Sequence, residues 1–342
     1  MADPQAGTTF GPEVYDQAGA PKGRRGFWRR LRPSGSPAAV RRWSVRAAFV
    51  VLVLLLIYYP VGALIMHKVD DNLAYTPDIP AAAGGSRAVA MAAGLITREV
   101  DQHGWTANDP VFMPSAILDN MPNFQQGLVA ALARFAFELT DQIGRTRGTS
   151  TVDPDLQEAA GLLQYSGTKW IFDLSTSLAP TATSEAQYRQ ARRALLNYNV
   201  RLARNEAVFE RRADNLLATM DRMAADLGSS SAAIERRLRE GPAVFDEQAD
   251  DIFYTVKGQL YAYRMLLNEL SIDFERVIKE RDLVSAWEQM LKTLSEGSQL
   301  DPLFILNGSA DNQFIPSHLA GQGFYLMRAR AQLREITNIL LK

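Results

Sequence analysis

Few residues of this chain have the types and the spacing that catalysis requires. Ser166 and Lys169 form a Ser-x-x-Lys match. In penicillin-binding proteins and some β-lactamases, that spacing places a nucleophilic serine one helical turn from a lysine. The Lys-Thr-Gly and Ser-x-Asn elements of those enzymes are missing from the chain, and the pattern shows no sign of their extended sheet. The match therefore predicts no catalytic serine.

A second candidate concerns glycan chemistry. The run Gly161-Leu162-Leu163-Gln164 resembles the Gly-Leu-Met-Gln element of lytic transglycosylases, which are helical and use one catalytic glutamate that normally precedes a serine. Here the upstream acid, Glu138, precedes Leu139, and Glu158 is the other nearby acid. A glycosidase acid needs a cleft and a raised pKa. A cell-wall-active enzyme of this helical type is the alternative hypothesis.

Metal and thiol chemistry have little to build on. The chain has no cysteine, which excludes disulfides, thiol nucleophiles and thiolate metal sites. Glu99 and His103 lie one helical turn apart but lack a third ligand, so the spacing favours a surface ion pair. The remaining histidines stand far apart in sequence: His67 and His318. We assign no catalytic residue, no cofactor-binding residue, no metal ligand and no cofactor.

One acidic run opens a predicted helix. Carboxylates at a helix N-terminus complement the helix macrodipole, so helix stabilisation is the first interpretation and cation binding the second. Three tyrosines follow at helical spacing and are expected in the core. The acids are Asp246, Glu247, Asp250 and Asp251, and the tyrosines are Tyr254, Tyr261 and Tyr263.

The element that must position all of these residues is an uncharged stretch of twenty residues, Ala47–Met66. At about 1.5 Å per residue it reaches about 30 Å, the thickness of a bilayer's hydrocarbon core. It is longer than the apolar core of a signal peptide. With its flanks it predicts a transmembrane signal anchor over residues 43–68, in contact with the lipid bilayer through residues 47–66.

Charge gives the expected orientation. Residues 1–46 carry nine Lys and Arg against three Asp and Glu, whereas the rest of the chain carries 28 against 35. An excess of Lys and Arg marks the cytoplasmic side of a span. We therefore expect residues 1–42 to be a disordered, cytoplasmic basic arm that binds anionic lipid headgroups. The acidic remainder argues against a nucleic-acid partner.

Beyond the anchor the pattern is almost entirely helical. A linker is predicted over residues 69–85 and an all-helical domain over 86–342, with helices near 86–102, 123–143, 154–165, 168–177 and 317–341. Heptad seams predict two long helices, about 184–227 and 243–281. The first seam has one stutter, between Phe209 and Ala213. We expect the two helices to pack as an antiparallel hairpin, with an intermolecular coiled coil as the alternative.

The one β signal is Asn307-Gly308, flanked by short apolar runs, which predicts at most one small β-hairpin.

Three segments carry a family resemblance: the span itself, Gly104–Gln125 (GWTANDPVFMPSAILDNMPNFQ) and Leu162–Leu174 (LLQYSGTKWIFDL). Through them the chain resembles a family of uncharacterised proteobacterial inner-membrane proteins, a domain of unknown function with one N-terminal span and a periplasmic helical domain. The resemblance implies a bacterial host and a periplasmic ectodomain. It supplies no site residue.

Together these features predict an all-α protein, with a single transmembrane helix followed by an extended helical bundle. It is expected in the bacterial inner membrane, with its N-terminus cytoplasmic and its C-terminal domain periplasmic. The leading hypothesis is a non-enzymatic scaffold of the cell envelope that binds a protein partner, or itself, through the long helices. Besides the enzyme above, a periplasmic ligand sensor is an alternative.

Overall fold

A computed structural model describes residues 37–117, 119–144, 152–172, 179–242, 246–309 and 315–342. Within those ranges the protein is all-α, as predicted, and contains no strand. The chain divides into two units, Met1–Leu55 and Leu56–Lys342, and the boundary falls inside helix α1 (Pro37–Met66). Most of the predicted basic arm lies outside the described residues. Its last six residues, 37–42, are helical rather than irregular, and proline suits the first turn of a helix.

Helix α1 has the dimensions of a span. Its 30 residues are long and apolar enough to cross a membrane, and almost all of its side chains are exposed. A core helix of similar composition would be buried. Pro60 lies inside the helix without ending it.

The first two helices after α1 end in π-turns. Helix α2 (Arg87–Thr97) is capped by Ser86, as predicted, and continues into a π-turn, Arg98–Gln102. Helix α3 (Asn120–Glu138) continues in the same way into Leu139–Ile143. A short 3-10 turn, Pro114–Ile117, lies between them.

Glycine sets the closest helix contact of the bundle. Helix α3 packs most extensively against α7 (Glu247–Asp273). A Cβ on Gly127 would lie 1.9 Å from the Thr255 carbonyl oxygen, and one on Gly258 would lie 2.0 Å from the Phe124 carbonyl oxygen. The two backbones therefore touch, which only glycine permits.

The predicted helix 184–227 is two helices. Helix α5 (Ser184–Ala203) ends where Asn205 has a φ of 57°, and α6 starts at Ala213. The break covers the stutter. Phe209 leaves the helical register and packs against Phe274, with their ring centroids 5.8 Å apart. The Glu210 N–H donates to the Ile143 carbonyl.

Helix α6 (Ala213–Arg239) runs through Gly228, where we expected a helix end. The reason is its main partner, α10 (His318–Leu340). A Cβ on Gly228 would lie 3.0 Å from Cζ of Arg330, so glycine gives room to that side chain. Because α6 packs chiefly on α10, and α7 on α3, the long 184–227/243–281 hairpin is wrong as the main packing of these helices.

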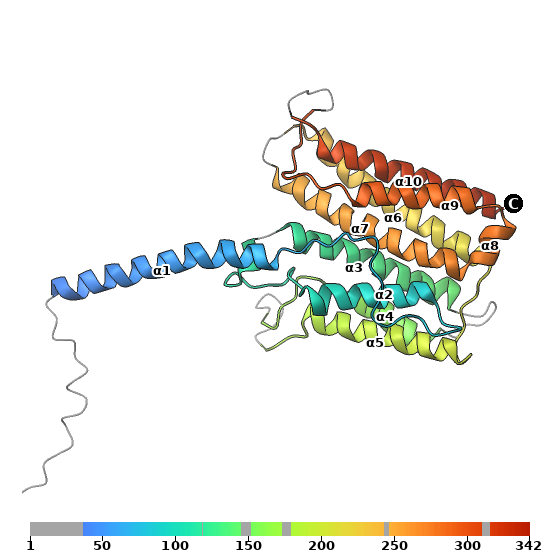
Figure 1. The fold of residues 1–342 in the computed structure, drawn as a ribbon, viewed down its shortest axis with the longest axis horizontal. Coiled ribbons are helices and arrows are strands. Elements are labelled where there is room, and N and C mark those ends of the chain that lie inside the picture. Colours follow the sequence, from blue (N-terminus) through green and yellow to red (C-terminus); the bar gives the residue numbers. More distant parts are fainter. Residues whose placement is uncertain (1–36, 118, 145–151, 173–178, 243–245, 310–314) are drawn as a thin grey trace, which may run out of the picture. The chain divides into compact units, whose positions relative to one another are not determined.

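The remaining helices complete the bundle: α4 (Pro154–Leu163) against α5, α8 (Glu275–Glu280), and α9 (Val284–Ser298) between α7 and α10. Figure 1 shows α6, α9 and α10 on one side of α7 and α2 to α5 on the other. The described part of the predicted helix 168–177, residues 168–172, is not helical. The predicted hairpin is reduced to one antiparallel bridge between Asn307 and Ser317, and residues 310–314 lie outside the described ranges.

Candidate functional site

The segment that joins α1 to the bundle, residues 67–78, is here called the connector. It has no regular helix or strand, yet it is bound to the bundle along its length. Its backbone and side chains contact α2, its π-turn, α3 and α7 through hydrogen bonds and ion pairs that are 2.8–3.7 Å long: Lys68 with Met121, Asp70 with Arg98, Asp71 with Lys257, Asn72 with Tyr261, Tyr75 with Gly94, and Asp78 with Gln102. The predicted linker is therefore docked, not a free tether.

A buried ion pair lies at the centre of these contacts. Arg98 and Glu99 are both almost fully buried, and the guanidinium Nη2 lies 2.8 Å from Oε1 of Glu99. Two successive residues of an α-helix point about 100° apart, so both would not normally face one core. Here the π-turn adds one residue to the turn, and the His103 N–H donates to the Arg98 carbonyl at 2.9 Å. π-turns of this kind are frequent at functional sites.

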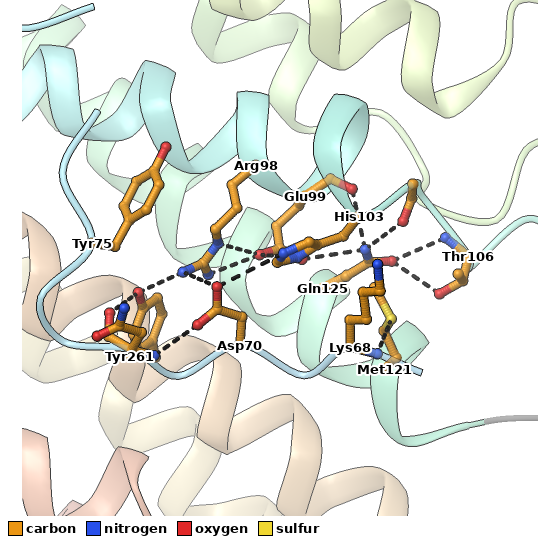
Figure 2. A network of polar contacts seen from close by, with 12 residues as sticks. Lys68, Asp70, Tyr75, Arg98, Glu99, His103, Thr106, Met121, Gln125 and Tyr261 are labelled. Carbon is orange, nitrogen blue, oxygen red and sulfur yellow. Dashed lines mark hydrogen bonds and ion pairs between the residues drawn. The ribbon is translucent and has the colours of Figure 1, made fainter. Parts of the chain in front are cut away.

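Tyrosine rings and a second acid surround the guanidinium. Arg98 Nη1 donates to the Tyr261 hydroxyl at 2.6 Å and lies 3.7 Å from Asp70 of the connector. Its Cζ is 5.0 Å from the ring centroid of Tyr75 and 4.8 Å from that of Tyr261, within cation–π range. Figure 2 shows the guanidinium pointing between these groups.

These surroundings keep Arg98 charged and the tyrosines neutral. Burial acts to lower the pKa of Arg98, but Glu99, Tyr261 and Asp70 outweigh it, and the pKa is raised. Burial raises the pKa of Tyr261 to about 12, although the Arg98 charge opposes this shift. The hydroxyl therefore stays protonated and donates to the Asn72 carbonyl at 2.8 Å. One tyrosine thus links Arg98 to the connector backbone.

Gln125 of α3 completes the network on its other side. Its amide nitrogen donates to the Gly104 carbonyl at 2.8 Å and to Glu99 at 3.3 Å, and its oxygen accepts from the backbone and hydroxyl of Thr106. His103 lies 3.7 Å from Glu99 and 3.8 Å from Asp70. The Glu99–His103 spacing therefore marks a buried cluster and not a surface ion pair, since Glu99 is fully buried.

A second buried cation holds the connector from α7. Lys257 is 1% exposed, donates to the Leu300 carbonyl at 2.8 Å and pairs with Asp71 at 2.9 Å. Breaking a buried ion pair by removing one partner typically costs about 3–5 kcal/mol. The geometry of the network thus fixes the connector in place.

The sequence candidates for catalysis lie elsewhere. Ser166 and Lys169 lie in a turn, not a helix, so the one-turn geometry of the Ser-x-x-Lys motif is absent. Glu158 is exposed and accepts from Gln190 at 2.5 Å. A cavity of ≈ 590 Å³ is lined by Arg134, Gln164, Tyr165, Tyr188 and Asp226 among others; neither Glu138 nor Glu158 lines it.

Glu138 is nevertheless a perturbed acid. It is 1% exposed, its Oε1 lies 4.0 Å from Arg134, a residue of the cavity wall, and burial raises its pKa to about 7. Arg222 and Arg134 oppose that rise. A carboxyl with this pKa suits a general acid, and it equally suits a buried structural acid.

Glu138→Gln is expected to alter the pH dependence of stability. The folded-state pKa of about 7 lies above the ordinary 4.5, so the unfolded chain loses its proton first and stability falls between about pH 4.5 and 7. Glutamine does not ionise. The variant should match the parent at pH 4.5 and exceed it at pH 8 by about 1–3 kcal/mol, measured by thermal unfolding of the full chain in detergent. An equal change in stability at both pH values would contradict the raised pKa of Glu138. The control is Glu235→Gln, at an exposed glutamate.

One acid of the run, Asp246, caps α7, in agreement with the predicted helix stabilisation. Asp246 accepts from the Ala249 N–H at 3.0 Å and from Asn307 at 2.8 Å. Burial, with Asp119 and Asp251 nearby, raises the pKa of Asp250 to about 7. Among the described residues, no group of three or more His, Asp or Glu could hold a metal. The tyrosines of the run are buried core residues, also as predicted.

Comparison with known proteins places the chain in a family. Residues 45–241 and 245–342 match the model of an uncharacterised protein conserved in bacteria, DUF2333. The chain belongs to the DUF2333 family. No curated protein and no solved structure matches it.

The DUF2333 match includes the second half of α1, the connector and every helix of the bundle. Two of the segments that resemble the family contact each other or the buried network in the structure. Gly104–Gln125 supplies Gln125 and Thr106 to the network, and its Trp105 donates to the Gly167 carbonyl in the other segment at 2.7 Å.

Sequence reasoning missed Arg98, Gln125, Lys257 and the role of Tyr261 in this site. One signal was available, since Arg98 and Glu99 directly follow the apolar residues of α2, where a charged pair is unexpected. Their partner Tyr261 lies 163 residues away.

Proposed function

We propose that this DUF2333 protein is a single-pass envelope protein of the bacterial inner membrane, and that its helical bundle is a partner-binding scaffold fixed at the periplasmic surface. The observation that carries the proposal is the docked connector. A helix with the dimensions of a span leads directly into residues 67–78. Buried charges on the π-turn after α2 and on α7 hold these residues to the bundle. A free tether would need none of these contacts.

The charge pattern supports the orientation. Nine basic residues precede Ala47 and the remainder is acidic, which favours a cytoplasmic N-terminus. The bundle then lies in the periplasm. The contacts of the connector hold the bundle close to the C-terminal end of α1.

Covalent cross-linking of the tagged full-length protein in its native membrane, followed by purification, tests the scaffold. We expect a discrete product with one protein partner, or with a second copy of this chain. Arg98→Met, which removes the ion pair between the connector and the π-turn after α2, should change the yield or pattern of that product. Products that are spread over many unrelated proteins would contradict the proposal.

The second candidate function is cleavage of cell-wall glycan, favoured by the raised pKa of Glu138 next to a cavity with Gln164 in its wall. Purified full-length protein would then release soluble fragments from peptidoglycan, and Glu138→Gln would abolish the release. Under the scaffold proposal neither protein releases fragments.

A further inference from the structure

An apolar surface, largely exposed, lies beside the C-terminal part of α1. It consists of two loop segments and is here called the collar: Val111, Phe112, Met113 and Ile117 between α2 and α3, and Trp170, Ile171 and Phe172 between α4 and α5. Val111 is 83% exposed, Ile117 59% and Phe112 55%. Residues 110–117 contain no charged side chain.

The first loop is bonded to α1 itself. The Tyr59 hydroxyl donates to the Val111 carbonyl at 2.8 Å, and the Tyr58 hydroxyl donates to the Phe112 carbonyl at 3.2 Å. A Cβ on Gly62 would lie 2.4 Å from Pro114, so the loop and the helix are in direct contact there. Tyr59 lies seven residues before Met66, or about 10 Å along the helix. The loop thus reaches back alongside the apolar helix.

The second loop is fixed to the first. Trp170 stacks edge-to-face on Phe112 and on Phe172, with ring centroids 5.8 Å and 5.7 Å apart. Asn108 donates to the Lys169 carbonyl at 2.8 Å. The two loops therefore present one surface, with a tryptophan of the type enriched at membrane interfaces.

Several backbone polar groups of the first loop are hydrogen-bonded or absent, which suits an apolar medium, where unpaired amide groups are costly. Pro110 and Pro114 have no N–H group. The Met113 N–H donates to the Pro110 carbonyl and the Ala116 N–H to the Met113 carbonyl. The tyrosine hydroxyls satisfy the carbonyls of Val111 and Phe112. A loop exposed to water needs no such provision.

We propose that the collar enters the outer leaflet of the bilayer that α1 crosses, so that the bundle holds the membrane at a second surface besides its span. The occupant of this surface is lipid: acyl chains around Val111 and Phe112, and headgroups around Trp170. This inference rests on the proposed anchoring through α1.

Single cysteines test the collar, because the chain has none of its own. Val111→Cys, Ile171→Cys, Leu54→Cys in the span and Met327→Cys on α10, which is 62% exposed, are each labelled with the fluorophore NBD. The full-length variants are reconstituted into vesicles of phosphatidylethanolamine and phosphatidylglycerol. The emission maximum and the quenching by aqueous iodide are then measured.

We expect blue-shifted emission and loss of iodide quenching at positions 54, 111 and 171, and water-like emission with full quenching at 327. A lipid signal at 54 with water-like signals at 111 and 171 would overturn the collar and leave the anchor intact. A water-like signal at 54 would overturn the anchor, and the collar with it. Val111 is so exposed that its substitution should not disturb folding.

Discussion

Gly258→Ala is expected to destabilise the protein by about 3 kcal/mol or more, the upper end of the cost of overpacking. The added Cβ would lie 2.0 Å from the Phe124 carbonyl oxygen. That atom is backbone of α3 and cannot move unless the α3–α7 crossing opens. Gly127→Ala should have a similar effect, since its Cβ meets the Thr255 carbonyl oxygen at 1.9 Å. Circular dichroism of the full chain in detergent should show a fall in melting temperature of several degrees or more.

Gly161→Ala is the matched control. This glycine also lies within a helix, α4, but a Cβ there has no neighbour within 4 Å. Alanine should stabilise the protein by about 0.5–1 kcal/mol, the usual gain in helix propensity. If Gly258→Ala and Gly161→Ala had the same effect, close contact between α3 and α7 would be contradicted.

Arg98→Met is expected to cost about 3–5 kcal/mol, because it leaves the buried Glu99 carboxylate without its cation. It also removes the donor to Tyr261 and the charge that faces Asp70 of the connector. Hydrogen exchange of residues 67–78 should therefore accelerate more than exchange in α6 or α10. Thermal unfolding measures the overall loss of stability, and hydrogen exchange shows which segments lose protection.

Two further variants sharpen this result. The first is a control at an exposed ion pair, Arg239–Glu235, whose charged atoms lie 2.9 Å apart. Because exposed pairs contribute little to stability, Arg239→Met should change the free energy of unfolding by less than about 0.5 kcal/mol. In the double variant Arg98→Met with Glu99→Leu, both charges are gone, so it should be more stable than Arg98→Met alone. If the double variant instead lost as much stability as Arg98→Met and Glu99→Leu lose together, the Arg98–Glu99 pairing would be contradicted.

Much of the fold followed from local pattern. Ser86 predicted the start of α2, and the apolar spacing predicted α3 with its π-turn, α4 and α10 to within a few residues. The predicted helix 243–281 is instead two helices, α7 and α8, which are divided at Phe274. These features depend on helix period and capping, which neighbouring residues determine.

The break between α5 and α6 did not follow from the pattern. The heptad seam predicted that Phe209 faces the core from a helix. Phe209 is buried, but it lies in the non-helical segment between α5 and α6. The stutter marked the place, yet contacts with Phe274 and Ile143 decide the turn. Those partners come from distant parts of the chain, and a local seam contains no information about them.

The buried network was hidden for the same reason. Helical spacing put Glu99 and His103 on one face, and a surface pair was the simplest interpretation. The π-turn at Arg98–Gln102 and the distant Tyr261 turn that face into the core. The apolar helix α1, in contrast, followed directly from the sequence, because a run of twenty uncharged residues is recognised without knowledge of its partners.

The proposed topology is a bundle in the periplasm behind a single membrane anchor. It is tested most directly when single cysteines in intact spheroplasts are labelled with a membrane-impermeant maleimide. Glu235→Cys, at a residue whose side chain is 64% exposed on α6, should react without permeabilisation, and Ser34→Cys in the basic arm should react only after it. The reverse pattern would place the bundle in the cytoplasm, and reaction of both positions only after lysis would contradict the span.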